Sequence, residues 1–332
     1  MNNFTKILKE DSFGALSERF TVIIPTRGLN GKYLKLVIES YNKFLDPLSI
    51  YEIIIITPDD NVKEYVKKYN NFKFKVLKDE EVVPIIPLVA QGDGWIIQQY
   101  IKLMIAANIE TDYYMIFDDD LFLVKPLKYE DLFHNVSGDL RLRYSSEPLK
   151  TLSTPTFSSK TWWEGSAKLL HVRFPQDKSI SDYLDSIFHS EQRKRDDDDK
   201  LMSVTPQVFV TEYVLKLLLE LPIDWMTKFK EYGASEYSLY WLFLRNSRSE
   251  PEGRLSDVSR NSGLHEKYTD ECTHWWYTDS NTSLLNPTDN VDELTRIIYN
   301  GIHNNKGYFM VIQSWIGIDE GLIKMILDKV QL

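Results

Sequence analysis

YYMIFDDDLFLVKPL, residues 113–127, runs an apolar segment into three consecutive aspartates, Asp118, Asp119 and Asp120, and then resumes as an apolar segment. The apolar residues before the aspartates are typical of a buried strand. An ionised carboxylate is costly at the end of a buried strand unless a partner compensates its charge. The stretch therefore predicts either a charged binding site or an acidic loop that caps a helix or is exposed to water.

The first 127 residues alternate strand-like and helix-like patterns. Four short apolar runs predict strands: residues 20–25, 51–57, 72–77 and 113–117. Segments with helical spacing lie between them: residues 33–45, 61–69 and 95–108. This alternation implies an α/β fold, with a mostly parallel sheet and helices on both of its faces. Such sheets bind ligands beyond the carboxyl ends of their strands, which here read PTRG, TPDD and FDDD.

The rest of the chain carries a weaker pattern. Three further runs predict strands: LRLRYSS (140–146), KLLHVRF (168–174) and YFMVIQS (308–314). Four segments predict helices: residues 206–220, 235–245, about 290–300 and 318–330. The charge run at 191–200 predicts a solvated loop.

The composition excludes several classes of protein. Of the 332 residues, 43% are hydrophobic and 27% are charged, which is typical of a globular chain and not of collagen, coiled coils or disordered proteins. The formal net charge of −10 argues against a nonspecific nucleic-acid binder. Cys272 is the only cysteine, so we expect neither an intrachain disulfide nor a Cys-based zinc site.

The sequence predicts an intracellular, cytoplasmic protein. Its first residues lack a basic segment followed by an apolar one, and no uncharged apolar run approaches about 18 residues. We therefore expect no transmembrane segment. A membrane-bound substrate would be reached by peripheral contact.

The spacing of the aspartates suits a metal ion. If the strand persists, Asp118 and Asp120 share one of its sides and Asp119 points away. Two carboxylates about 7 Å apart in backbone terms can share one hard cation. Mg²⁺ and Mn²⁺ are candidates because they prefer carboxylate and phosphate oxygens.

Together with two further motifs, the acidic stretch resembles a known family. IFDDDLFL is similar to the Asp-any-Asp motif of the nucleotide-sugar-dependent glycosyltransferases with the GT-A fold. GWIIQQYIKL (94–103) and SEYSLY (235–240) resemble helices of a group of polysaccharide-building transferases. The resemblance implies a GT-A, Rossmann-like fold. It also implies a nucleotide-sugar-binding half at 1–127 and, in the same domain, an acceptor-binding half with C-terminal helices at 128–332.

The resemblance implies that the following residues bind the nucleotide sugar: Pro25, Thr26, Arg27, Asp59 or Asp60, Asp93, Gly94, Trp95, Gln98, Lys102 and Asp118. Asp118 would contact the ribose or, through water, the metal, and Asp120 would bind metal and diphosphate directly. A run of three aspartates in place of a plain Asp-any-Asp leaves open whether Asp119 contributes. The structural alternatives are a strand-ending turn, helix N-caps and a helix face that meets solvent.

Glu236 is the implied general base. An inverting transferase needs a carboxylate that takes the proton of the acceptor hydroxyl, but a Glu at the start of a helix is also favourable with the helix dipole. His274, or else His265, is the implied further metal ligand, although lone histidines are often structural.

Four tryptophans are candidates for binding the acceptor: Trp162, Trp163, Trp275 and Trp276. Flat aromatic rings suit the apolar faces of sugars. Core packing explains any one of these tryptophans equally well.

The sequence therefore predicts an inverting glycosyltransferase that uses Mn²⁺ or Mg²⁺ and moves a sugar from a nucleoside-diphosphate sugar to a glycan or polysaccharide hydroxyl. A retaining enzyme, a sugar-phosphate nucleotidyltransferase and a non-catalytic glycan-binding protein remain as alternatives. PTRGLNGKY lacks the glycine spacing that a nucleotidyltransferase needs. No G-x-G-x-x-G follows the first strand, which argues against an NAD-dependent dehydrogenase.

Overall fold

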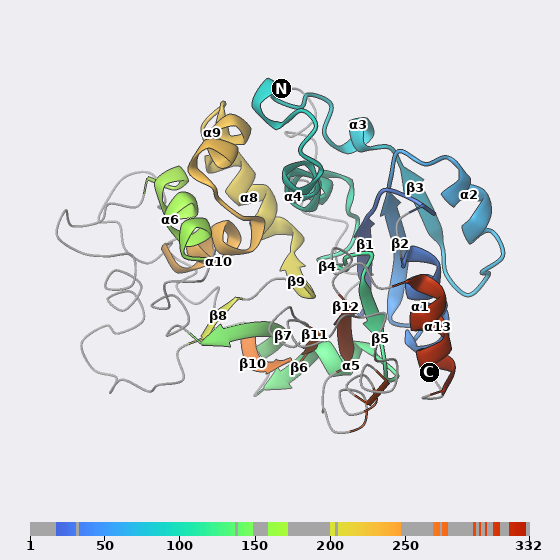
Figure 1. Ribbon diagram of the computed structural model, residues 1–332. Helices are drawn as coiled ribbons and strands as arrows, with labels where there is room; N and C mark the ends of the chain where they lie inside the picture. The colour runs from blue at the N-terminus through green and yellow to red at the C-terminus, as the bar shows by residue number, and fades with distance from the viewer. Residues whose placement is uncertain are drawn as a thin grey trace.

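The computed structural model describes residues 18–30, 33–136, 139–148, 159–171, 200–202, 205–246, 268–272, 274–277, 295–296, 299, 303, 308–312 and 319–329. Figure 1 shows the helices of this part, which are α1 (Leu34–Phe44), α2 (Asn61–Val66), α3 (Asp79–Val82), α4 (Gly94–Met104), α5 (Tyr129–Leu132), α6 (Ser159–Leu169), α8 (Thr211–Glu220), α9 (Trp225–Tyr232), α10 (Glu236–Asn246) and α13 (Glu320–Lys329). Two 3₁₀ helices cover Leu88–Ala90 and Ile105–Asn108. The strands are β1 (Phe20–Pro25), β2 (Ile50–Ile56), β3 (Phe74–Leu77), β4 (Tyr113–Ile116), β5 (Leu121–Leu123), β6 (Phe133–Val136), β7 (Asp139–Pro148), β8 (Lys200–Met202), β9 (Gln207–Val210), β10 (Tyr268–Cys272), β11 (His274–Tyr277) and β12 (Phe309–Ile312).

A five-stranded sheet forms the centre of the molecule, in the order β3-β2-β1-β4-β9. The first four strands are parallel and β9 runs antiparallel to β4. The isoleucines of β2, Ile53–Ile56, are fully buried, as expected for a parallel strand covered on both faces. The predicted α/β fold, with a mostly parallel sheet flanked by helices, is confirmed.

Two smaller sheets lie against this centre. One has the order β10-β7-β6 with β8 paired to β7, and the other has the order β11-β12-β5. Strand β12 pairs with β5, and the amide of Ile312 donates to the carbonyl of Asp120 at 3.0 Å. A strand late in the chain therefore fixes the backbone of the acidic stretch.

Helices α6, α9 and α10 pack together on the side of α4, on the left of Figure 1. Gly165 of α6 permits this close approach, because a Cβ there would lie 2.4 Å from the carbonyl oxygen of Tyr232. Gly233 ends α9 in the left-handed region, with φ of 71°. The chain can therefore turn at once into α10, whose first residue is Glu236.

Some predicted elements are wrong. Residues 206–220 do not form one helix, because Gln207–Val210 pair with β4 as β9 and the helix begins only at Thr211. A short apolar run has no periodicity that would show whether it forms a buried strand or part of a buried helix. Lys168 and Leu169 end α6 instead of opening a strand, and α9 was not predicted.

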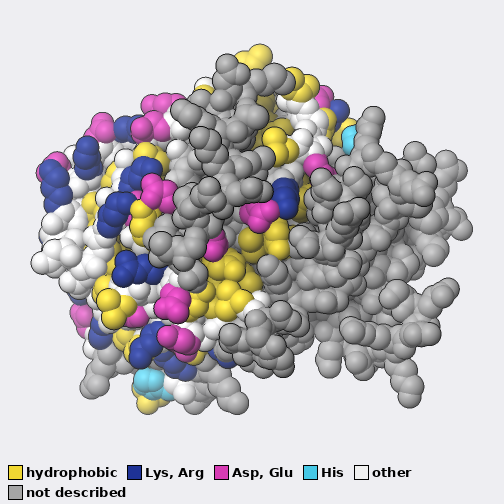
Figure 2. Space-filling view, turned by 180° about the vertical axis from the view of Figure 1, so that it is seen from behind, with side chains coloured by type: hydrophobic (Ala, Val, Ile, Leu, Met, Phe, Trp, Pro, Cys, Tyr) yellow, Lys and Arg dark blue, Asp and Glu magenta, His cyan; other side chains and the backbone are white. Residues whose placement is uncertain are grey.

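The surface mixes charges of both signs. Figure 2 shows lysine and arginine side chains interspersed with acidic ones over the described part of one face. Several form pairs, such as Lys67 with Glu64 at 2.5 Å and Lys216 with Glu212 at 2.7 Å. Within the described residues, no helix is long and apolar enough to cross a membrane.

Candidate active site

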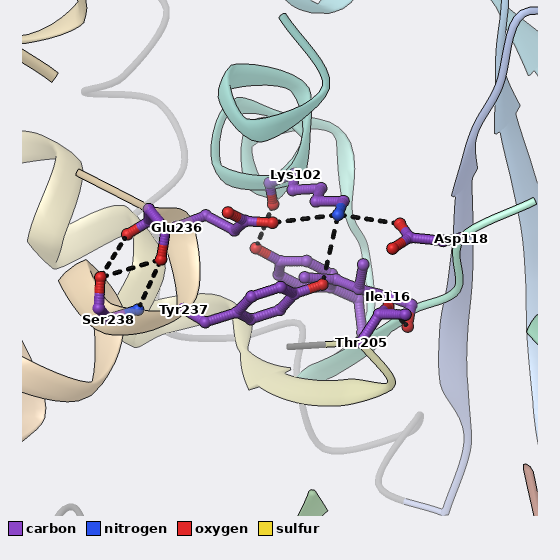
Figure 3. A network of polar contacts seen from close by, with 9 residues as sticks. Lys102, Ile116, Asp118, Thr205, Glu236, Tyr237 and Ser238 are labelled. Atoms are coloured by element: carbon purple, nitrogen blue, oxygen red, sulfur yellow. Dashed lines mark hydrogen bonds and ion pairs between the residues drawn. The ribbon is translucent and has the colours of Figure 1, made fainter. Parts of the chain in front are cut away.

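The ammonium of Lys102 joins three motifs that are far apart in the sequence. Its Nζ atom lies 2.9 Å from Oδ1 of Asp118 and 3.0 Å from Oε1 of Glu236 (Figure 3). The side chain of Lys102 is 6% exposed and that of Glu236 is 3% exposed. The GWIIQQYIKL helix, the acidic stretch and the SEYSLY helix therefore meet at one buried cation.

Neighbouring groups hold this cation in place. The hydroxyl of Tyr114 donates to the backbone carbonyl of Lys102 at 2.9 Å, which ties α4 to β4. The ammonium donates to the hydroxyl of Tyr237 at 3.4 Å and lies 5.2 Å from the centre of that ring. Tyr237 follows the predicted base directly, but no pattern in the sequence predicts its contact with Lys102.

The pair of charges offsets the cost of burial. Burial raises the pKa of Glu236, Lys102 lowers it, and the pKa stays above its usual value. Burial alone lowers the pKa of Lys102, but Asp118 and Glu236 raise it well above the usual value. Lys102 is therefore a permanent cation, and its neighbour Glu236 is a carboxylate of increased basicity.

The three aspartates lie in a turn and not on a strand. Strand β4 ends at Ile116, and the amide of Leu121 donates to the carbonyl of Asp118 at 3.2 Å. The alternation of an extended strand, which would put Asp118 and Asp120 on one side and turn Asp119 away, does not apply here. That part of the prediction is wrong because the strand stops before the first aspartate.

Asp119 lies against the loop that follows β1. Its Oδ2 atom accepts a hydrogen bond of 2.6 Å from the hydroxyl of Thr26. Burial raises the pKa of Asp119, and the Thr26 hydrogen bond lowers it in part. Asp120 is 7% exposed, and its charge helps to raise the pKa of Tyr33 and of Tyr41, for which burial is the larger cause.

A cavity of about 320 Å³ opens at the carboxyl ends of β1 and β2. Five of the residues predicted to bind the nucleotide sugar line it: Pro25, Thr26, Arg27, Gly94 and Gln98. The cavity adjoins the acidic turn, because Thr26 both lines it and donates to Asp119. Its position agrees with the rule that open α/β sheets bind ligands beyond the carboxyl ends of their strands.

Gly94 allows Arg27 to cross the start of α4. A Cβ at position 94 would lie 2.4 Å from a guanidinium nitrogen of Arg27. The cavity therefore combines a cationic side chain with the amino end of a helix, and both favour an anion.

Asp59 and Asp60, which are also predicted to bind the nucleotide sugar, have partners within the protein. Asp59 accepts hydrogen bonds of 2.9 Å from the amides of Leu29 and Asn61, which lower its pKa. Asp60 is exposed and pairs with Lys78 at 2.5 Å. Their proposed contact with the nucleotide base stays a prediction.

Asp93 is the N-cap of α4. It accepts from the amide of Ile96 at 3.2 Å and forms an ion pair with Lys230 of α9. Both contacts lower its pKa, the Lys230 hydrogen bond more than the cap. The cap gives Asp93 a structural role, and a contact with the sugar stays a prediction.

The tryptophans differ in exposure. Trp95 is 49% exposed, and its ring centre lies 5.9 Å from that of the partly buried Trp162. Trp163 is 2% exposed and belongs to the core, as the packing alternative describes. Of the two adjacent tryptophans, only Trp162 presents part of its ring to a ligand.

The structure describes less of the candidate metal and acceptor ligands near the end of the chain. His274, Trp275 and Trp276 lie on β11, opposite Phe309, Met310 and Val311 of β12. Their side chains and the whole of His265 lie outside the described residues. Their predicted roles in binding metal and acceptor stay predictions.

The acidic groups suit a hard cation. Lys102 pairs with Asp118 and Glu236, while Asp119 and Asp120 add further negative charge beside them. Among the described residues, no three His, Cys, Asp or Glu side chains are grouped as ligands of one metal. A cation bound by one or two of these carboxylates would take its further ligands from a phosphate or from water.

Removing the shared ammonium should destabilise the fold. Lys102→Met leaves Glu236 buried with an uncompensated charge, and breaking a buried ion pair in this way costs about 3–5 kcal/mol. We expect the free energy of unfolding, measured with urea near neutral pH, to fall by that amount. Lys216→Met, which removes a surface partner of Glu212, should cost less than about 1 kcal/mol.

The free energy of unfolding that Lys102→Met loses relative to wild type should become smaller as the pH falls from about 8 to about 5. Without the ammonium the pKa of Glu236 rises further in the folded state, and a raised carboxyl pKa destabilises increasingly above the unfolded-state pKa and fully only above the folded-state pKa. Protonation then removes the charge. A variant as stable as wild type at every pH would contradict the buried ion pair.

The fold is similar to several solved glycosyltransferases. A bifunctional glycosyltransferase, WbbM, matches with a TM-score of 0.45 at 12% identity over 95% of this chain and 50% of its own, so the present chain spans half of that protein's length. The galactosyltransferase LgtC, in complex with donor and acceptor sugar analogues, has a TM-score of 0.45 at 10% identity and covers 94% of this chain and 97% of its own. TarS of S. aureus has a TM-score of 0.33 at 13% identity over 94% and 43%. All three TM-scores are below 0.5, so no residue role is transferred from these proteins.

No curated protein matches the sequence. Residues 18–330 match the model of a family described as a family of unknown function, DUF6492. Because this match spans nearly the whole chain, the protein belongs to the DUF6492 family.

Proposed function

We propose that the protein is a glycosyltransferase that moves a sugar from a nucleoside-diphosphate sugar to a hydroxyl of a glycan acceptor. The observation that carries this proposal is the meeting of Asp118 and Glu236 at the buried ammonium of Lys102. The cavity lined by Thr26 and Arg27 adjoins the same acidic turn. The site thus combines a candidate anion pocket, an acidic turn and a candidate base.

The cavity supplies the features that a nucleoside diphosphate needs. Arg27 and the amino end of α4 favour a negatively charged group, and Gln98 offers an amide in the same lining. Asp118 and Asp120 would hold Mn²⁺ or Mg²⁺ together with the diphosphate. A bound divalent cation would stabilise the negative charge of the departing diphosphate.

Glu236 is the proposed general base. It takes the proton of the acceptor hydroxyl while the acceptor oxygen bonds to the anomeric carbon and the bond from that carbon to the diphosphate oxygen breaks. Burial makes this carboxyl more basic, and the Lys102 ammonium favours its ionised form. A single displacement of this kind inverts the anomeric configuration.

Lys102 takes a different role from the one implied by the resemblance. Its ammonium is committed to Asp118 and Glu236 inside the protein and is not among the residues that line the cavity. We therefore assign Lys102 to orienting the base and the acidic turn, and we leave the contacts with the diphosphate to Arg27 and the helix terminus.

Two alternative functions differ in testable ways. A retaining enzyme keeps the anomeric configuration, which proton NMR of the product reveals, and it does not need Glu236 as a base. A non-catalytic glycan-binding protein has no need of the buried carboxylates, whose desolvation is costly.

Binding of a nucleoside diphosphate tests the donor site. UDP or GDP with Mn²⁺ should raise the melting temperature by a few degrees, because a ligand at about one hundred times its Kd stabilises by about 2.7 kcal/mol. Asp120→Asn should lose this shift and abolish sugar transfer while the protein stays folded. Asp224→Asn, which changes an exposed carboxylate of α9 paired with Lys228, is the control. If neither nucleotide shifts the melting temperature of the wild type, the donor-site assignment is wrong.

Glu236→Gln tests the base. Sugar transfer should fall by about 10²–10⁴-fold, since a positioned general base contributes that much, and the thermal shift with nucleotide should persist. Glu212→Gln, on the exposed face of α8, should keep full activity. Retention of most of the activity by Glu236→Gln, with a product of unchanged anomeric configuration, would identify a retaining enzyme instead.

A further inference from the structure

Among the described residues that line the cavity beyond β1 and β2, Asp79 is the one acidic residue. It is the first residue of α3 and stands two residues after the end of β3. Most of the remaining wall is apolar and is formed by Pro25, Ile56, Pro58, Ile97 and Ile101. The cavity therefore extends from the carboxyl end of β1 across β2 to that of β3.

The carboxylate of Asp79 makes neither a hydrogen bond nor an ion pair with any other described residue. Burial raises its pKa, the charge of Glu80 raises it further, and Lys78 lowers it in part. It does not cap its helix, because the carboxyl of Glu81 accepts from the amide of Lys78 at 2.6 Å where α3 begins. This half-buried carboxylate is therefore available to the donor groups of a ligand.

The two aspartates that follow β2 are not available in the same way. Both carboxylate oxygens of Asp59 accept hydrogen bonds from backbone amides. Asp60 is exposed and pairs with Lys78. Neither side chain is among the described residues that line the cavity, so Asp79 is the acidic group that a ligand there would meet.

The order of the strands fixes the direction in which a nucleotide would lie. In the order β3-β2-β1-β4, the acidic turn follows β4 and Asp79 follows β3. Helix α3 lies at this end of the sheet (Figure 1). Three strand spacings of about 4.8 Å separate the two positions, which is about 14 Å in all. A nucleoside diphosphate with its phosphates beside Thr26 and the acidic turn would therefore direct its base past β2 toward Asp79.

The edge of the base decides which nucleotide suits a carboxylate. An ionised carboxylate only accepts hydrogen bonds, through two oxygens that lie side by side. Guanine presents two adjacent donors, its ring N1–H and its exocyclic amino group. Uracil presents one ring N–H between two carbonyl oxygens, which a carboxylate repels. Adenine and cytosine each place an acceptor nitrogen beside the amino group, so guanine is the best match.

We propose that Asp79 selects guanine, by accepting hydrogen bonds from both donors of this edge, and that the donor is a GDP-sugar. This inference rests on the proposed function and names the class of its donor. It assigns the contact with the base to Asp79 in place of Asp59 or Asp60. The apolar walls of the cavity would cover the flat faces of the base.

Calorimetric titration of the full-length chain with nucleoside diphosphates and Mn²⁺ tests the selection without turnover. GDP should bind about ten- to one-hundredfold more tightly than UDP, because a bidentate pair discriminates between bases to about this extent. Inosine diphosphate, which keeps the ring N1–H of GDP and lacks its amino group, should bind about tenfold more weakly than GDP.

Asp79→Asn should change the selection and not only weaken it. The new amide keeps the size of the side chain but presents one donor and one acceptor. It should weaken GDP binding by about tenfold or more and improve the binding of xanthosine diphosphate, which has a carbonyl oxygen where GDP has its amino group. An unfolded variant cannot gain a ligand. Glu80→Gln, which changes the exposed neighbour of Asp79 on α3, should keep the preference of wild type.

Three outcomes would overturn the assignment. UDP that binds wild type as tightly as GDP would contradict the selection of guanine and leave the proposed donor site intact. Asp79→Asn that binds GDP as wild type does would remove Asp79 from the base site. A gain of xanthosine diphosphate binding in Asp60→Asn instead would return the contact to the loop after β2. If wild type bound none of these nucleotides, the proposed function itself would be wrong, and this inference with it.

Discussion

The buried ammonium of Lys102 is the constraint on which the site depends. Asp118 and Glu236 come from separate parts of the chain, and both place a carboxylate against Nζ at about hydrogen-bond distance. The side chains of Lys102 and Glu236 are almost completely buried, and an unpaired charge in a protein interior is strongly destabilising. These two charges can be buried only together, and the partly exposed Asp118 is the second partner of the ammonium, so the ammonium fixes the acidic turn relative to the start of α10.

This constraint explains why α4 lies where it does. One face of the helix closes a cavity at the carboxyl ends of β1 and β2, and another carries Lys102 to the helices that hold the candidate base. Tyr114 fastens the end of the helix to β4, and Asp93 caps its beginning. A single helix thus sets the distance between this cavity and the candidate base.

The sequence predicted the strands and helices of the fold better than the side-chain contacts of the site. The four parallel strands and the position of α4 follow from runs of β-branched residues, helical spacing and the Gly-Asp-Gly start of the helix. Strand β9 was missed because its four apolar residues precede a helix directly and only pairing with β4 makes them a strand. Local periodicity carries no information about such long-range pairing.

The side-chain contacts of the site could not be predicted for a similar reason, because they join residues that are far apart in the sequence. Lys102 and Tyr237 are 135 residues apart, and spacing on α4 alone did not show whether the lysine faces solvent or protein. The partner of Asp119 was hidden by the assumption that the strand continues, whereas the chain turns at Asp118 and brings Asp119 to Thr26.

The central claim is that Lys102 is a buried, charged and doubly paired ammonium. Proton–nitrogen NMR of ¹⁵N-lysine-labelled protein tests it directly, because exposed ammonium groups exchange their protons with water quickly and a buried, hydrogen-bonded one does not. A buried, paired Lys102 should give an ammonium signal that persists near neutral pH and disappears in Lys102→Arg. A spectrum without a protected ammonium signal, or one whose protected signal survives that substitution, would contradict it.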